Sequence, residues 1–394
     1  MKKYFVLLLL IPLIICLVIF ALTAAANEGK EGRKFNILCS TYPPMDEFIS
    51  CQNTMIKWYA EDHNVNLYWA ETSTDCAGEV QVKNAMAVLR TTDIDGVILC
   101  SPDAKPQKTI TDYCKENNIP VIGFQEPTDS PDILMYVGTV PNIHGAMCGK
   151  AMKEALIEKF GEVKGNIFIV DTTPASVTHH ARTLGFISEF KDEPNVIIHR
   201  EEVKTITVDA SKKVTTSYLE LGNDFDAGWG PSGAMPEGII QALKDFPGAK
   251  IEDKIIIGSE AYSNVMEGVR DGYVKAVTMP AAQYQGAIAL KYLLDYLNGE
   301  KLPSIGTTID KFVIEGGIPR KGFDPWNEEY IKEACLPAQV LSLQEAIKDY
   351  PDIKEYYTYD YPFWSQDVPI ITQKEGNAPW VWGNFPYNWA EEVR

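Results

Sequence analysis

The side chains best suited to hold a small ligand stand where short apolar runs end. The run VIGF is followed directly by Gln125 and Glu126, an amide and a carboxylate that together can donate and accept hydrogen bonds. Hydroxyl, carboxylate, aromatic and proline side chains occupy comparable positions: Ser40, Tyr42, Trp229, Ser232, Glu260 and Pro280. This mixture favours a site for a small, polar and partly flat ligand, although any one of these residues could be an ordinary loop residue.

One glycine motif suggests nucleotide binding, and its details argue against it. The sequence GWGPSG, residues 228–233, matches the G-x-G-x-x-G pattern of dinucleotide-binding turns. That pattern belongs to the first strand-to-helix turn of its fold, whereas this one occurs deep in a second series of strands and contains bulky Trp229 and rigid Pro231. We therefore interpret it as a ligand-facing loop in which Trp229 turns its ring into a cleft.

The sequence predicts neither enzymatic activity nor a bound metal or cofactor. His179 and His180 are adjacent, and neighbouring side chains on a helix point about 100° apart, so both cannot easily bind one ion. One of them could face a cleft beside Arg182. No GxSxG, HExxH or Walker A sequence occurs, so no nucleophile and base can be paired.

The elements that must position these residues alternate between strand and helix. Runs such as FNILCS, DGVILCS and KIIIGSE are typical of buried strands, and apolar residues recur at the helical period between them. The predicted helices span residues 46–63, 79–92, 106–117, 143–160, 177–190, 210–221, 234–246, 263–270 and 282–297. This alternation indicates parallel sheets covered on both faces, and its repetition predicts two similar lobes. Ligands of such sheets bind beyond the carboxyl ends of the strands.

The amino-terminal residues have the composition of an export signal. Lys2 and Lys3 precede an apolar run at residues 5–22, and Ala24 and Ala26 form a small-x-small cleavage pattern. We predict a signal peptide at residues 1–26 and a protein exported to the periplasm or the outer side of the membrane. The run is also long enough to remain as an uncleaved membrane anchor.

Charge and cysteine content exclude several other classes of protein. The formal net charge of −18 disfavours nucleic acid and anionic membrane surfaces as partners, because phosphate groups would be repelled. Cleavage would leave seven of the eight cysteines, without CxxC spacing, which argues against a disulfide scaffold or zinc site. Cys51 with Cys76, or Cys39 with Cys100, could still pair.

Several segments resemble the type I periplasmic solute-binding proteins of ABC transporters, the group that contains ribose-binding proteins. The segments are DIDGVILCSPD, ENNIPVIGFQE, VGTVPNIHGAMCGKAM, ARTLGFISEF and IIIGSEAYSNVMEGVRDGYVKAVTMP with its following helix. The resemblance covers residues 34–322. It implies an α/β fold of two doubly wound parallel-sheet lobes joined by a three-strand hinge, with crossings near residues 139–142, 279–281 and 309–311. It places 34–140 plus 281–309 in the first lobe and 141–280 plus 310–322 in the second.

The same resemblance implies roles for individual residues. Arg182 matches an arginine that binds sugar hydroxyls, which suits the fixed geometry of its guanidinium group. Glu260 stands where relatives usually carry an aspartate, and Ser232 and Pro280 replace a usual Asn and Gln. Gln125 and Glu126 replace the Asp-Arg pair of ribose binders. Ring-stacking faces are expected from aromatic side chains at three positions: Tyr42, Phe48 and Trp229.

The resemblance implies a monomeric binding protein that delivers a small hydroxylated ligand to ABC permease subunits. The expected ligand is a monosaccharide or a related polyol or amino sugar. The extra acids favour a ligand with more hydrogen-bond donors than ribose, such as an amino sugar, a polyol or a cationic small molecule. An alternative is a sensor subunit of the same fold that docks on a membrane receptor or kinase. Beyond the resemblance, the carboxy-terminal extension at residues 323–394 is rich in aromatics, so we expect it to be ordered against the body. Residues 338–350 in it have a helical pattern.

Overall fold

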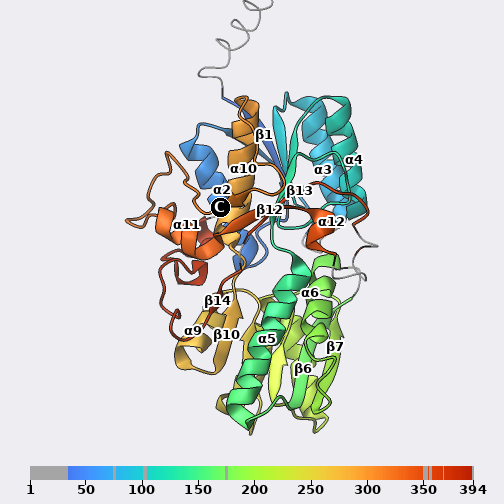
Figure 1. Ribbon diagram of the computed structural model, residues 1–394, viewed down its shortest axis with the longest axis vertical. Coiled ribbons are helices and arrows are strands. Elements are labelled where there is room, and N and C mark those ends of the chain that lie inside the picture. The colour runs from blue at the N-terminus through green and yellow to red at the C-terminus, as the bar shows by residue number, and fades with distance from the viewer. Residues whose placement is uncertain are drawn as a thin grey trace, which may run out of the picture.

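The computed structural model describes residues 34–73, 77–100, 104–173, 176–348, 354, 357–366 and 368–392. The chain forms two lobes, one above the other in Figure 1, and each has a mostly parallel sheet with helices on both faces. The two-lobed α/β architecture predicted from the alternation of strands and helices is therefore confirmed. The predicted signal peptide, residues 1–26, lies outside the described residues.

The first lobe is built on an eight-stranded sheet in the order β11-β12-β13-β5-β4-β3-β1-β2. Its strands are β1 (Asn36–Thr41), β2 (Asn66–Glu71), β3 (Gly96–Leu99), β4 (Val121–Phe124), β5 (Met135–Gly138), β11 (Thr308–Ile309), β12 (Ala338–Ser342) and β13 (Pro362–Ser365). Its main helices are α2 (Glu47–Asp62), α3 (Gly78–Thr91), α4 (Ala104–Glu116) and α10 (Ala282–Leu297). The strands β1 to β5 and β13 are parallel, so their carboxyl ends meet at one edge.

The second lobe has a six-stranded sheet in the order β14-β10-β9-β8-β6-β7. Its strands are β6 (Gly165–Thr172), β7 (Val196–Val203), β8 (Ala227–Trp229), β9 (Ile255–Gly258), β10 (Val274–Thr278) and β14 (Ile370–Ile371). Its helices are α5 (Pro141–Phe160), α6 (Val177–Ser188), α7 (Val208–Glu220), α8 (Ala234–Asp245) and α9 (Ser263–Asp271). The carboxyl ends of β6, β8, β9 and β10 also meet at one edge, which faces the first lobe.

Local sequence explains where the helices that border the lobe junction begin. The backbone of Asp46 is extended, and its side chain accepts a hydrogen bond from the amide of Ile49 at 2.8 Å, which caps α2. Helix α10 lies against α2, and a β-carbon at Gly286 would come within 2.3 Å of the Ile56 side chain. A larger residue there would separate the two helices, so this glycine fixes the helix pair above the first sheet.

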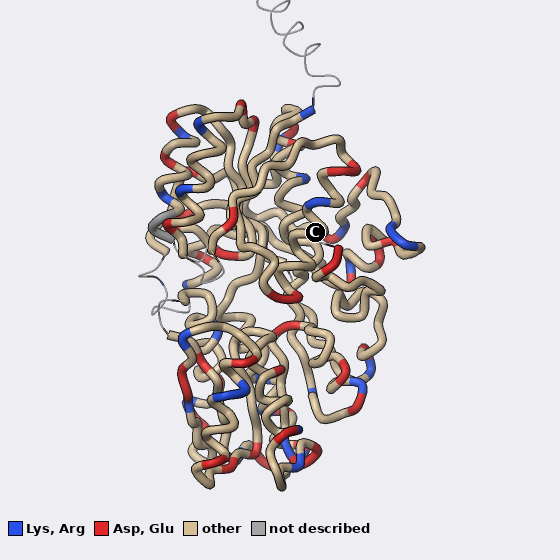
Figure 2. The backbone as a smooth tube through the Cα atoms, turned by 180° about the vertical axis from the view of Figure 1, so that it is seen from behind, with Lys and Arg blue, Asp and Glu red and all other residues tan. Residues whose placement is uncertain are grey.

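Charged residues do not divide the molecule into basic and acidic parts. Acidic residues outnumber basic ones, 54 to 36. Figure 2 shows both kinds interspersed along the backbone of the two lobes. The excess of negative charge is therefore spread over the protein, as expected for a soluble surface rather than a single binding face.

The carboxy-terminal extension is ordered against both lobes. It contributes α11 (Glu328–Cys335), α12 (Leu343–Ala346), η3 (Trp382–Asn384) and α13 (Trp389–Glu392), besides β12, β13 and β14. Strand β13 pairs with β5 of the first lobe, and β14 pairs antiparallel with β10 of the second. The helix expected at residues 338–350 is instead a strand, Ala338–Ser342, followed by a short helix, because Ala338–Ser342 pairs with β13.

The third crossing between the lobes does not lie at residues 309–311. Residues 310–322, expected in the second lobe, lie on the first, where the Ile318 amide donates to Asp62 at 2.8 Å and Arg320 pairs with Asp62 at 2.6 Å. The chain stays in the first lobe because it goes on to extend that sheet with β12 and β13. It crosses to the second lobe between β13 and β14, while the first two crossings follow β5 and β10.

Candidate functional site

The polar strand-end residues of both lobes meet at the junction between the two sheets. Glu126, Arg182, Ser232 and Glu260 are all buried, with exposed fractions of 8%, 5%, 3% and 5%. Ser40 is completely buried. Because these positions lie at facing carboxyl edges, their burial shows that the two lobes are closed on each other.

An arginine and a glutamate form the centre of the second lobe's side of the junction. Arg182, on α6, donates through Nη1 to Glu260 Oε1 at 2.9 Å and to the carbonyl of Pro231 at 2.8 Å. The other carboxylate oxygen of Glu260 accepts from the Gly233 amide at 2.7 Å. The GWGPSG loop thus binds both members of the pair, through the carbonyl of Pro231 and the amide of Gly233. Both charges are neutralised within one lobe, so this side is preformed.

Close packing of two helices fixes the position of Arg182. A β-carbon at Gly145 on α5 would lie 1.8 Å from the carbonyl oxygen of Arg182. A β-carbon at Gly185 on α6 would lie 2.0 Å from the carbonyl oxygen of Asn142. The two glycines therefore let the backbones of α5 and α6 touch at the level of the junction. These contacts set Arg182 against Gly145, and Asn142, three residues earlier on α5, against Gly185.

The first lobe contributes acids whose partners come from the second lobe. Glu126 accepts a hydrogen bond from the hydroxyl of Thr178 at the start of α6. Burial raises the pKa of Glu126 to about 7; the Thr178 hydrogen bond and the charge of Arg182 oppose this rise, and Glu260 adds to it. The same carboxyl group is thus in electrostatic contact with both members of the preformed pair.

A second group of contacts joins the lobes at the start of α2. Glu47 Oε2 accepts from the amide of Ser263 at 2.8 Å and from its hydroxyl at 2.9 Å. Burial raises the pKa of Asp46 to about 6, against the effect of its hydrogen bond from Ile49; Glu260 raises this pKa further, and a hydrogen bond from Tyr262 lowers it. These contacts, and the one at Glu126, must break when the lobes separate.

His179 lies beside Arg182, as the sequence allowed. Its Nδ1 is 2.8 Å from the Ser176 hydroxyl. Burial, followed by the positive charge of Arg182, lowers the pKa of His179 to about 3. The imidazole is therefore neutral at physiological pH, and Arg182 remains the cation that faces the acids at this point.

Several buried polar atoms at the junction have no hydrogen-bond partner among the described residues. They are Ser40 Oγ, Arg182 Nε, Ser232 Oγ, Gln283 Oε1 and both side-chain heteroatoms of Asn142 and of Gln366. Burying such an atom without a partner costs about 1–3 kcal/mol, and native proteins satisfy most of them. The set contains donors and acceptors, which hydroxyl groups can satisfy because each can both donate and accept.

Two of the predicted residues turn away from this set. Trp229 is completely buried in the core of the second lobe, where its ring stacks on Phe186 at 4.1 Å and 8°. The prediction that its ring faces the cleft is therefore corrected: the short strand β8 directs this side chain into the lobe. Gln125 has a left-handed backbone, φ 60°, and its side-chain oxygen accepts from Gln52 at 2.6 Å inside the first lobe.

The remaining predicted residues are buried near the junction. Phe48 meets Trp382 of the extension edge-on, with ring centroids 6.1 Å apart. Tyr42 is buried beside α2, and its carbonyl accepts from Asn53 at 3.0 Å. Pro280 lies buried at the second crossing, where its carbonyl accepts from Ala282 at 2.8 Å. Their placement is compatible with a shared site, although it gives no ligand contact by itself.

Some residues of the junction are difficult to recognise from the sequence, because their partners are distant in the chain. These residues are Asp46, Thr178, Tyr262 and Asn142. Asp46 and Thr178 stand at the starts of helices that lead away from strand ends, and this position was the available signal. Trp382 gave no comparable signal, because it reaches the junction from an extension with no recognised pattern.

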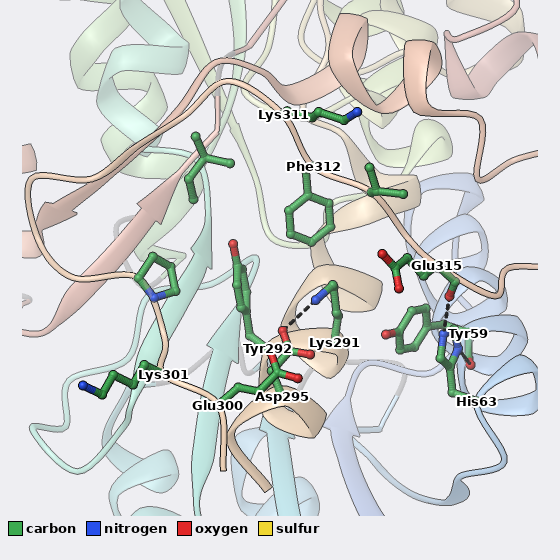
Figure 3. Close-up of a pocket in the computed structure, with 13 residues that line it drawn as sticks. Tyr59, His63, Lys291, Tyr292, Asp295, Glu300, Lys301, Lys311, Phe312 and Glu315 are labelled. Carbon is green, nitrogen blue, oxygen red and sulfur yellow. Dashed lines mark hydrogen bonds and ion pairs between the residues drawn. The ribbon is translucent and has the colours of Figure 1, made fainter. Parts of the chain in front are cut away.

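A separate cavity of about 590 Å³ lies on the first lobe between α2, α10 and the segment around residues 300–315 (Figure 3). Several of its polar groups already have partners, and none of its described lining side chains carries a buried polar atom without one. Lys291 pairs with Asp295 at 2.6 Å, and the ring nitrogens of His63 bond the carbonyls of Tyr59 and Glu315 at 2.8 and 2.7 Å. This cavity therefore lacks the unpaired polar atoms that distinguish the junction.

Metal and disulfide chemistry find no support in the described ranges. No group of three or more His, Cys, Asp or Glu residues there could hold a metal ion. Cys39, Cys51 and Cys100 are buried free thiols, so the pairing considered for Cys39 and Cys100 does not form; Cys76 lies outside the described residues. None of the helices in those ranges is both long and apolar enough to cross a bilayer.

Comparisons with known proteins agree with this geometry. The galactofuranose-binding protein YtfQ of Escherichia coli is 22% identical over 304 residues, which cover 74% of this chain and 93% of that protein. An ABC transporter solute-binding protein of Bacillus halodurans with bound myo-inositol has a TM-score of 0.61 and 20% identity, covering 68% of this chain and 91% of that one. One of Actinobacillus succinogenes with bound D-allose has a TM-score of 0.62 and 18% identity, covering 69% and 94%.

The family model described as the periplasmic binding protein domain matches residues 39–301. This range includes the greater part of both lobes and the Arg182–Glu260 pair, and it excludes the extension. The fold, the closed junction and the family match lead to one conclusion. The chain belongs to the periplasmic binding protein family, whose members are exported binding proteins rather than enzymes.

Proposed function

We propose that the protein is the substrate-binding protein of an ABC importer and binds a small hydroxylated ligand between its lobes. The observation that carries the proposal is the set of unpaired buried donors and acceptors at the closed junction, which includes Arg182 Nε. A sugar or polyol has several hydroxyl groups on one small frame. It can therefore pair with many of these atoms at once, which water could do only as separate molecules.

The charge at the junction supports a neutral or cationic ligand. Asp46, Glu126 and Glu260 are carboxyl groups in electrostatic contact there, and Arg182 faces them. Carboxylates accept hydrogen bonds from hydroxyl or ammonium groups and repel phosphates and acids. Monosaccharides, polyols and amino sugars fit this balance, and sugar phosphates do not.

Binding is coupled to closure of the lobes. The second lobe holds Arg182 and Glu260 in place without help from the first lobe. A ligand that binds this pair first gains further contacts, at Glu126 and Asp46, when the first lobe closes over it. Closure is favoured because the ligand interacts more strongly with the closed form than with the open form.

The cellular role rests on export and on a membrane partner. We propose that residues 1–26 are removed after Ala26. The mature monomer then delivers its ligand, from the outer side of the cytoplasmic membrane, to permease subunits in that membrane. The solved relatives described as solute-binding proteins of ABC transporters support this role. Loss of ligand uptake on deletion of the gene would distinguish it from a sensor role, in which uptake would persist.

A thermal-shift screen tests the proposal directly. The protein lacking residues 1–26 is heated with myo-inositol, D-allose, L-arabinose, D-galactose, glucosamine and glucose 6-phosphate, each at millimolar concentration. A ligand at 100 times its Kd stabilises the folded state by about 2.7 kcal/mol and raises the melting temperature. We expect at least one neutral or amino sugar or polyol to do so and the phosphate not to. A panel without any shift would contradict the proposal.

A further inference from the structure

The carboxy-terminal extension passes through the lobe junction twice. It leaves the first sheet after β13 at Ser365 and joins the second sheet at β14. It then follows α9, where Arg270 donates to Asn384 at 2.8 Å, and returns to α2 of the first lobe through Trp389. In Figure 1 the dark red segment accordingly runs down to β14 and ends beside α2.

Gln366 stands at the floor of the junction on the first of these passages. Its backbone N–H donates to the carbonyl of Gly138 at 3.0 Å, and the strand before it runs parallel to β5. Gln366 therefore extends the same carboxyl edge that carries Glu126. The side chain has an exposed fraction of 4%, and neither its oxygen nor its nitrogen has a partner among the described residues.

The other two crossings carry side-chain amides in a similar state. Asn142 follows the first crossing, and Gln283 follows the second; both are completely buried. Neither side-chain heteroatom of Asn142 has a described partner, and the oxygen of Gln283 also lacks one. Each of the three crossings thus carries a buried amide with unsatisfied hydrogen-bonding capacity at the level of the junction.

Trp382 closes the junction on the second passage. Its ring lies between Phe48 of the first lobe, 6.1 Å away, and Tyr262 of the second, 5.9 Å away. The next residue is held tightly, since a β-carbon at Gly383 would lie 2.0 Å from the carbonyl oxygen of Ala261. Trp382 is completely buried, and its Nε1 has no partner among the described residues.

We propose that the extension supplies part of the ligand site, with Gln366 bonding ligand hydroxyls at the floor and Trp382 forming a wall. This inference rests on the proposed function and deepens it, because it assigns specificity to a segment beyond residue 301, where the family match ends. The amide of Gln366 offers one acceptor and two donors. It therefore suits a ring or polyol with neighbouring hydroxyls, and the indole of Trp382 suits the apolar face of that ligand.

Two conservative variants with matched controls test the inference. Gln366→Met keeps the length of the side chain and removes its amide, while Gln339→Met makes the same exchange at an exposed position of the neighbouring β12. Trp382→Phe keeps a ring and removes Nε1. Trp389→Phe makes this exchange where the ring packs on Trp58 of the first lobe. Each variant is titrated calorimetrically with myo-inositol, D-allose and L-arabinose, and its melting temperature is measured without ligand.

We expect Gln366→Met to raise the Kd of the best-bound compound about tenfold and Trp382→Phe to raise it about threefold, corresponding to the loss of one hydrogen bond or part of one. We also expect the ratio of affinities among the three compounds to change, which a purely structural role would not produce. Both controls should leave the Kd values within about twofold. If both site variants bound these compounds with the wild-type Kd, this inference alone would be overturned. If the wild-type protein bound none of the compounds in the thermal-shift screen, the proposed function would be overturned as well.

Discussion

The two sides of the junction differ in how their charges are satisfied. Arg182 and Glu260 are paired within the second lobe and are held by its own loops. Glu126 and Glu47 of the first lobe instead find their partners, Thr178 and Ser263, across the junction. The second lobe is therefore a preformed receptor, and the first lobe is completed by closure. This difference implies that variants of the two lobes should fail in different ways.

The largest effect is expected on the preformed side. Arg182→Ala leaves Glu260 buried without its cation, which costs about 3–5 kcal/mol. We expect loss of binding by at least a hundredfold in calorimetry and a melting temperature several degrees lower. Arg320→Ala breaks an arginine–carboxylate pair outside the junction and should lower the melting temperature without changing the Kd. Equal loss of binding in both variants would refute the special role of Arg182.

A backbone perturbation of the same side should come next. Gly145→Ala puts a methyl group where 1.8 Å separates it from the Arg182 carbonyl, so α5 and α6 must move apart at a cost of roughly 1–3 kcal/mol. We expect reduced stability in chemical denaturation together with weaker binding, since Arg182 shifts with its helix. Gly123→Ala is the control, because its β-carbon would meet Tyr136 at an ordinary 3.4 Å. Unimpaired binding in Gly145→Ala would show that this helix contact does not position Arg182.

The contribution of the first lobe should appear in the pH dependence of stability. Closure and burial raise the pKa of Glu126 from 4.5 to about 7, so the folded, closed protein binds this proton more tightly than the unfolded chain does. Its contribution to stability is therefore fully present below about pH 4.5 and is lost as pH rises toward 7. Compared with Glu126→Gln, the wild-type melting temperature should fall by roughly 2–5 °C over this range. A constant difference between the two proteins at all pH values would contradict the assignment.

The smallest effect is expected at the outer contact between the lobes. Glu47→Ala removes the acceptor for Ser263 and should weaken closure, raising the Kd about threefold in calorimetry. Glu79→Ala removes an acid from the first turn of α3, where it affects the helix dipole without touching the second lobe. If the two variants bound the ligand with the same Kd, the contact between Glu47 and Ser263 would not contribute to the closed state.

The local features of the fold were predictable because they depend on neighbours in sequence. Helix α10 has the predicted bounds, and α2 differs by one residue at each end, because apolar period and capping residues define helices locally. Residues 338–342 have a helical pattern but form a strand, because they pair with β13, which lies 20 to 26 residues later in the chain. The third crossing was misplaced for the same reason.

The same distinction between local and long-range features separates the site residues that were predictable from those that were not. The resemblance to a family gave Arg182 and Glu260 expected ligand-binding positions, and the structure shows that the two side chains pair with each other. Trp229 was misassigned because the direction of a side chain at the end of a three-residue strand depends on which core it enters. Gln366 and Trp382 were not foreseen, because only the path of the extension brings them to the junction.

The pairing of β13 with β5 and of β14 with β10 has a consequence for how the protein folds. Without the extension, β5 and β10 would be open edges of the two sheets, able to pair with other chains. Both edges are closed by residues beyond 360, which are distant in sequence from β5 and β10. Neither sheet is therefore complete until these distant residues have paired with it, and such long-range pairings should make folding slow and leave the two edges exposed meanwhile.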